Sequence, residues 1–244
     1  MGNPLEHFEL HRLIPISLFG IDISINEAVV MMWIVVLIVF GLFWLASRRI
    51  QIIPGRLQNM AEYWLELLQT YILEGNMGKE EGRTFLPFLG CLFLFIFFCN
   101  LLGLVPGAYT ATSQVMVTGT LAVLVYFICL SVGFAKHGLG FFKVFVPPGV
   151  PLWLLPFVVP IEIVSQLARP FSLALRLFAN MTAGHTVLAV LFGFVIVLKF
   201  YIGWLPFVFI LGMDAFEIFI ALIQAYIFTL LAAIYLGEVI HLHA

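Results

Sequence analysis

The feature that most constrains the fold is a long apolar run, at about residues 152–198, that carries two arginines. Arg169 and Arg176 both lie in its central segment, residues 166–185. A single arginine at the centre of a membrane helix costs about 2.5–3.5 kcal/mol on insertion scales. A chain that accepts this cost twice is expected to use the charge, so we expect this segment to carry the function.

Composition places the chain in a membrane. Of its 244 residues, 63% are hydrophobic and 10% charged, whereas soluble domains carry about 25% charged residues. The sequence has no basic patch of the kind that binds nucleic acid. The three cysteines lie in apolar runs without a CxxC motif, which argues against a disulfide framework or a zinc site. The sequence therefore predicts an all-α polytopic membrane protein.

Five apolar runs are long enough to cross a hydrocarbon core of about 30 Å. They lie at about residues 28–46, 85–105, 115–135, 152–198 and 205–237. The last two exceed one upright crossing, so we expect them to form a long, tilted antiparallel hairpin. Apolar residues at helical spacing predict an amphipathic interfacial helix at about residues 57–73. We expect a polar loop at residues 75–82.

The whole of residues 28–244 is expected to form a single transmembrane domain after an outer N-terminal surface segment, residues 1–27. Orientation follows from the tendency of lysine and arginine to lie in cytoplasmic loops. If the spans alternate, one side receives Arg48, Arg49, Arg56, Arg83, Lys136 and Lys143, and the other receives Arg12 and Lys199. This distribution predicts an outer N-terminus, a cytoplasmic C-terminus and an outer turn near residue 200.

Polar residues of the 152–198 run fall on one narrow stripe when they are placed on a helical wheel. At 100° per residue, the residues within about 40° of Arg176 are Ser172, Asn180, Arg169 and Glu162. His185 falls on the opposite face. In the last run, Gln224 shares a stripe with Glu217, and Asp214 lies about 60° away.

Folding the last two runs as a hairpin brings these residues to three levels. Residue numbers at equal depth add to about 400, which pairs His185 with Glu217, Arg176 with Gln224, and Glu162 with Glu238. His and Glu can exchange protons, whereas Arg cannot lose its proton. The pattern therefore predicts a proton path with a fixed positive charge at its centre. Since Glu217 and Asp214 lie near the outer turn, a partner must supply the acid that carries the proton past Arg176.

Two segments resemble subunit a of the F-type ATP synthase, the membrane stator of that rotary motor. They are SLALRLFANM at residues 172–181 and the QAYIF at residues 224–228 that follows Glu217. NLLGLVP at residues 100–106 is also similar to that family. The resemblance implies partners: a carboxylate-bearing ring of subunit c, a peripheral stalk of subunit b and the F1 ATPase subunits. It implies no cofactor or metal and no catalytic site of the chain's own.

The resemblance also implies residue roles. Arg176 is expected to separate two aqueous half-channels. The inlet from the outer side would be lined by Asn180, His185, Glu217, Gln224 and Asp214. The outlet to the inner side would be lined by Ser172, Glu162, Arg169 and Glu238. In some family members the inlet carries Glu first and His second, whereas His185 precedes Glu217 here. His185 favours protons over sodium, and the bacterial inner membrane is the expected location, with the mitochondrial inner membrane as the alternative.

Several alternatives stay open at this stage. Arg169 either lines the path or extends to the inner interface, and Asp214 either tunes the inlet or binds interfacial water. A stand-alone secondary transporter would show internal repeats and broken helices, and neither is evident. An intramembrane metalloenzyme would need more nitrogen ligands than His185 provides.

Overall fold

Five long helices dominate the computed structural model, which describes residues 12–14, 17–18, 21–22, 24–48, 55–105, 110–146, 151–202 and 204–241. They are α1 (Glu27–Ser47), α4 (Lys79–Gly103), α5 (Val115–His137), α6 (Leu155–Ile202) and α7 (Trp204–Ile240). Each is long and apolar enough to cross a membrane. The prediction of an all-α polytopic membrane protein with about five crossings is confirmed.

Short elements connect these helices. In the N-terminal segment, β1 (Arg12–Ile14) pairs with β4 (Ile25–Asn26), and β2 (Ser17–Leu18) pairs with β3 (Ile21–Asp22), both antiparallel. Between α1 and α4 lie α2 (Arg56–Leu68), the π-helix η2 (Gln69–Leu73) and α3 (Glu74–Met77). The 3₁₀ helices are η3 (Ala111–Ser113), η4 (Gly138–Phe145) and η5 (Leu152–Leu154). The predicted surface segment therefore contains two small antiparallel strand pairs, one inside the other, and its first eleven residues lie outside the described part of the chain.

The expected polar loop at residues 75–82 is wrong. The chain is helical from Glu74 to Met77 and again from Lys79 onward. Gly78 alone separates the two helices, with a φ of 83° that favours glycine. Glu80 and Glu81 occupy the first turn of α4, where acidic side chains interact favourably with the helix dipole. The charged residues that suggested a loop thus begin a helix.

The amphipathic segment presents three faces. In α2, Leu68 and Gln58 are buried against the bundle, whereas Glu62 and Glu66 are exposed. Apolar side chains on a third face are also exposed; they are Leu57, Met60, Tyr63, Leu67 and Tyr71. An exposed apolar stripe beside a polar face suits a helix that lies along a membrane interface.

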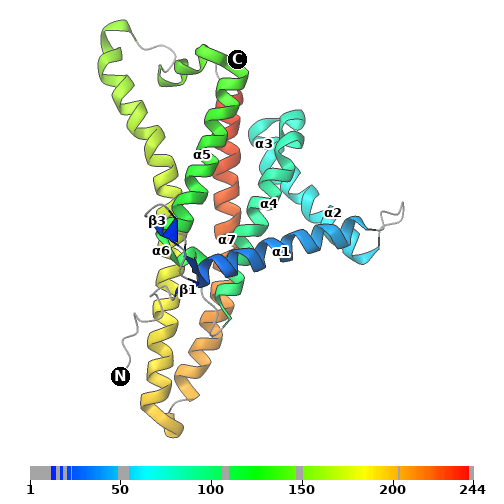
Figure 1. Cartoon of the computed structure of the whole chain (residues 1–244), viewed down its shortest axis with the longest axis vertical. Helices are drawn as coiled ribbons and strands as arrows, with labels where there is room; N and C mark the ends of the chain where they lie inside the picture. Colours follow the sequence, from blue (N-terminus) through cyan, green and yellow to red (C-terminus); the bar gives the residue numbers. More distant parts are fainter. Residues whose placement is uncertain are drawn as a thin grey trace.

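α6 and α7 form an antiparallel hairpin that is longer than a bilayer is thick. α6 has 48 residues and continues through Pro160 and Pro170, so it measures about 72 Å at about 1.5 Å per residue. A hydrocarbon core is about 30 Å thick, so the hairpin must lie strongly tilted. In Figure 1, α1 runs across α6 and α7 rather than alongside them. If α1 crosses the membrane upright, its direction relative to α6 and α7 requires that the hairpin be strongly tilted.

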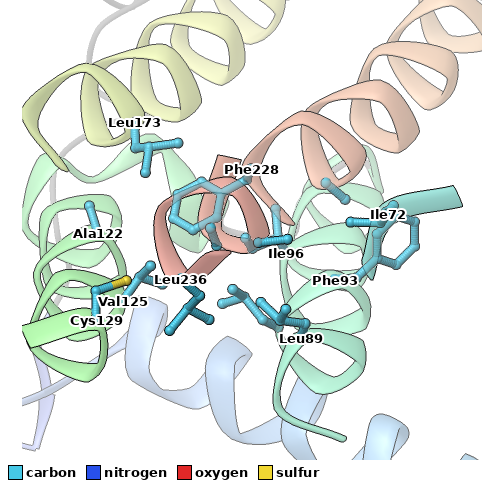
Figure 2. Packing of buried hydrophobic residues seen from close by; sticks show 14 of the residues in the cluster. Ile72, Leu89, Phe93, Ile96, Ala122, Val125, Cys129, Leu173, Phe228 and Leu236 are labelled. Carbon is cyan, nitrogen blue, oxygen red and sulfur yellow. The ribbon is translucent and has the colours of Figure 1, made fainter. Parts of the chain in front are cut away.

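The core is built around the second half of α7. Ala225, Ala232 and Ala233 are fully buried, and their small side chains let neighbouring helices approach closely. Phe228 and Leu236 of α7 lie between α4 side chains (Leu89, Phe93, Ile96) and α5 side chains (Ala122, Val125, Cys129), as Figure 2 shows. This packing fixes the rotation of α7.

Two ends of the bundle can be defined from these contacts. The hairpin end is where α6 passes into α7, at the bottom of Figure 1. The C-terminal end is where the last turn of α7 meets the α3 region, because His241 Nε2 lies 3.1 Å from the Met77 carbonyl oxygen. His137 at the end of α5 also contacts α7 there, with Nε2 at 3.1 Å from the Val239 oxygen.

Candidate functional site

The part of the α6 stripe around Arg176 faces away from the bundle. Leu173, Leu177 and Met181 are buried on the side that packs against the other helices, while Arg176 and Ser172 are exposed. Asn180, on the same stripe, is half-buried. Among the described residues, no ion pair or hydrogen bond joins the Arg176 side chain. Arg176 is therefore presented on the surface of a membrane helix without a partner from the described part of its own chain.

Small side chains surround Arg176 on that surface. Those exposed on the same side of α6 are Ala168, Ser172, Ala179 and Ala183. Small residues at membrane helix interfaces allow two backbones to approach closely. This face of α6 is thus shaped for another helix to pass close to Arg176.

Glu217 lies at the hairpin-end side of Arg176, and its carboxyl group packs against Gly184. Glu217 is only 5% exposed. A Cβ added to Gly184 would lie 2.9 Å from the Glu217 Cδ, so the carboxyl group would have to shift to admit it. Because Gly184 precedes His185, Glu217 stands at the level of His185, where equal-depth counting put it. Gln224, two turns further along α7, is also buried, and Asp214 is half-buried.

His185 itself contacts a segment that the sequence did not single out. Its Nε2 lies 2.7 Å from the Thr110 Oγ1, just before η3. η3 is held in turn by α4, because Thr112 Oγ1 donates to Asn100 Oδ1 at 2.8 Å. Thr110, Thr112 and Asn100 are all buried. In the sequence, residues 110–113 (TATS) lie between two apolar spans and are mostly hydroxyl residues. This pattern is typical of a turn and does not indicate a contact with His185.

Several buried polar atoms without a hydrogen-bond partner lie in the region around His185 and Glu217. Among the described residues, four buried side-chain atoms have no hydrogen-bond partner: Asn26 Oδ1, Asn100 Nδ2, Thr182 Oγ1 and Glu217 Oε1. The last three belong to the helices that surround η3 and Gly184. Buried polar groups in proteins are nearly always satisfied, by water where no side chain reaches them. The region around His185 and Glu217 is thus chemically suited to hold water.

A second polar cluster lies on the C-terminal-end side of Arg176. Arg169 forms an ion pair with Glu238 of α7, and its guanidinium lies 5.0 Å from the centre of the Tyr235 ring. Glu162 accepts a hydrogen bond from Gln166 at 3.1 Å. These residues line a cavity of about 480 Å³ between α5, α6 and α7. Polar groups therefore flank Arg176 on both sides along α6.

The partner of Glu238 differs from the one that equal-depth counting gave. Counting from a turn near residue 200 paired Glu238 with Glu162, whereas the ion pair is with Arg169. α6 ends at Ile202 and α7 begins at Trp204, so the hairpin turns later than assumed, and at this end of the hairpin the residue level with Glu238 is Arg169. Glu162 and Glu238 still share the cavity.

Comparison with known proteins identifies the family of the chain. The family described as ATP synthase A chain matches residues 29–237. The chain is 46% identical over 244 residues to ATP synthase subunit a of Magnetococcus marinus, which covers 99% of this chain and 94% of that protein. It is 44% identical over 243 residues to ATP synthase subunit a of Rhodospirillum rubrum, which covers both chains fully. The chain belongs to the ATP synthase A chain family.

For this member of the family, the Arg169–Glu238 pair yields a prediction. Exchanging the charges (Arg169→Glu with Glu238→Arg) should restore most of the stability that either single change removes, because the pair joins α6 to α7. The pair is partly exposed, so we expect a coupling of about 0.2–1 kcal/mol. Thermal unfolding of the purified complex in detergent measures it through a double-mutant cycle.

The Glu81–Lys136 pair, at 3.2 Å between α4 and α5, is the matched control. Its charge exchange should leave the α6–α7 contact unchanged. If Arg169 and Glu238 changes were simply additive, the ion pair would contribute nothing to holding the hairpin.

Proposed function

We propose that the chain is the proton-translocating stator subunit of an ATP synthase, with Arg176 as the barrier between two half-channels. The observation that carries this proposal is the position of Arg176. It is an unpaired charge on the exposed face of a membrane helix, between a polar cluster on the hairpin-end side and a polar cavity on the other. Family membership supports the same role.

The proposed inlet lies on the hairpin-end side. His185 and Glu217 can each take up and release a proton, and Asp214 adds a further carboxylate one turn from Glu217. The amides of Asn180 and Gln224 would orient water between them and Arg176. The unpaired atoms of Asn100, Thr182 and Glu217 favour hydration of this route.

The proposed outlet is the cavity at the C-terminal end. Glu162 is the carboxylate in it that is not ion-paired among the described residues, so it is the group available to receive a released proton. Ser172 lies between Glu162 and Arg176 on the same stripe. The Arg169–Glu238 pair would form one wall of the outlet and keep α6 and α7 together.

A carboxylate from a partner must carry the proton past Arg176, because the described acids of α6 and α7 lie to either side of it. A guanidinium favours the ionised form of a carboxyl group brought beside it, so a protonated carrier would release its proton on approach. The small residues next to Arg176 would let such a carrier come close. A ring of subunit c is the proposed carrier, with a subunit b stalk and the F1 subunits completing the complex.

The chain is an integral membrane protein. We further propose the bacterial inner membrane as its location, with an outer N-terminus and a cytoplasmic C-terminus, which makes the hairpin end the outer side. The Lys and Arg distribution supports this orientation. A stand-alone secondary transporter would need a substrate site between repeats. The described helices α6 and α7 instead run unbroken through the polar residues.

Purification and proton flux test the proposal together. A tagged chain should copurify with a carboxylate-bearing ring and with ATPase subunits. Vesicles that contain this complex should acidify or alkalinise when ATP is added, and should conduct protons when an electrical potential is applied after the ATPase subunits are removed. A chain that purifies alone and transports a solute by itself would overturn the stator proposal in favour of a transporter.

A further inference from the structure

We propose that Thr110 is a positioning residue for His185, and that its hydroxyl keeps the imidazole hydrogen-bonded in both protonation states. This inference rests on the proposed function, because it concerns how the inlet accepts protons. Neither Thr110 nor η3 carries a role in the path described above. Thr110 lies 75 positions from His185 in the sequence, and the tertiary fold brings the two side chains into contact.

The contact between the two residues is short and enclosed. Thr110 Oγ1 lies 2.7 Å from His185 Nε2, and Thr110 is 6% exposed. The same hydroxyl lies 3.4 Å from the carbonyl oxygen of Gly103, near the end of α4. Thr110 therefore stands between an imidazole nitrogen and a backbone acceptor.

The geometry allows the hydroxyl to serve either form of the ring. A threonine hydroxyl has one donor and two acceptor lone pairs. When Nε2 of His185 carries no proton, the hydroxyl can donate to it. When Nε2 is protonated, the hydroxyl can accept from it and turn its own hydrogen toward the Gly103 oxygen. Only the hydroxyl hydrogen rotates, so His185 can gain and lose a proton without losing this bond.

The surrounding structure holds Thr110 in place for this task. Ser113 Oγ donates to the Thr110 carbonyl oxygen at 2.7 Å, and Thr112 is tied to Asn100 of α4. Gly103 lets Thr110 come close, because a Cβ on Gly103 would lie 3.0 Å from the Thr110 Cβ. η3 packs against α1, α4, α5 and α6. Such constraint goes beyond what is needed to connect α4 with α5.

The elements packed around this part of α6 differ in the ionisable groups that they carry. α7 contributes Glu217, against Gly184, and Asp214. α1 carries Glu27 in its first turn. The described residues at the end of α4 and in η3, 100–105 and 110–114, contain no acid or base. From those two elements, the polar group that contacts His185 is the Thr110 hydroxyl.

The test compares Thr110→Val with Thr110→Ser in vesicles that contain the whole complex. Valine keeps the shape and removes the hydroxyl, whereas serine keeps the hydroxyl. Passive proton conductance is measured against the pH of the hairpin-end side and is normalised to the amount of complex that retains its ring. Thr110→Val should lower the conductance roughly fivefold, as expected for loss of one hydrogen bond. Its midpoint should move to lower pH, because the bond that the hydroxyl accepts from the charged imidazole is stronger than the bond that it donates to the neutral ring. Thr110→Ser should behave like the parent protein.

Thr229→Val is the matched control. Thr229 is a buried threonine of α7 whose hydroxyl donates to Ala225 of its own helix at 2.8 Å, so this change should leave rate and midpoint unaltered. Thr110→Ala, which removes the hydroxyl without adding a second methyl group, should repeat the result of the valine variant. An unchanged midpoint in both, or a serine variant as impaired as valine, would overturn the inference. A parent complex that conducts no protons would instead overturn the proposed function.

Discussion

Replacing Arg176 with alanine is expected to abolish ATP-driven proton pumping and coupled ATP synthesis. Arg176 is a charge on the exposed face of α6 and has no partner among the described residues, so its removal leaves the packing of the bundle intact. What is lost is the group that we propose to discharge the carrier and to separate the two half-channels. Removal of a single preorganised electrostatic group from an active site costs about 10²–10³ in rate, and we expect at least that loss here.

Vesicles that contain the complex provide the measurement, with ATP-driven pumping and gradient-driven synthesis recorded on the same preparation. Arg83→Ala is the control, because it removes an exposed arginine of α4 that lies outside both proposed half-channels. Arg176→Lys should be impaired as well, since an ammonium can lose its proton and lacks the planar guanidinium. Retained coupling in Arg176→Ala would show that the barrier is formed elsewhere.

The helical pattern of the sequence was sufficient to find the polar stripe of α6 and its hairpin with α7. This worked because both helices run unbroken, so residue spacing converts directly into angle and depth. Arg176 and Ser172 could be assigned to one face in this way. The level of Glu217 could be assigned too, because it depends on the same regular geometry.

Contacts outside that regular geometry could not be read from spacing. Thr110 contacts His185 from the connection between α4 and α5. The spacing of apolar residues does not predict the course of such a connection. The Arg169–Glu238 pair depends on where the hairpin turns, and an error of a few residues there changed the expected partner of Glu238. Residues 79–81 are charged and were expected to form a loop, yet they begin α4 after Gly78. A run of charged residues indicates exposure to water. The first turn of a helix can provide this exposure as well as a loop can.

Adding a methyl group at Gly184 is expected to slow proton uptake strongly, by about tenfold. A Cβ there would lie 2.9 Å from the Glu217 Cδ, so the carboxyl group must move or α6 and α7 must separate. Overpacking of this kind typically costs about 1–3 kcal/mol. Because Glu217 belongs to the proposed inlet and lies against Gly184, the residue before His185, the displacement should lower proton conductance even where the complex still assembles.

Gly193→Ala on the same helix is the control, because a Cβ at Gly193 meets nothing within 4 Å; its conductance should equal that of the parent. A second change tests the cause. Glu217→Asp shortens the side chain by one methylene, so Gly184→Ala with Glu217→Asp should conduct better than Gly184→Ala alone, a non-additive result typical of residues in contact. If the two changes were instead independent, the defect at Gly184 would have to come from something other than the position of the Glu217 carboxyl group. The close approach of α6 to α7 would then be a matter of packing, and Glu217 would act in the inlet without help from the glycine beside it.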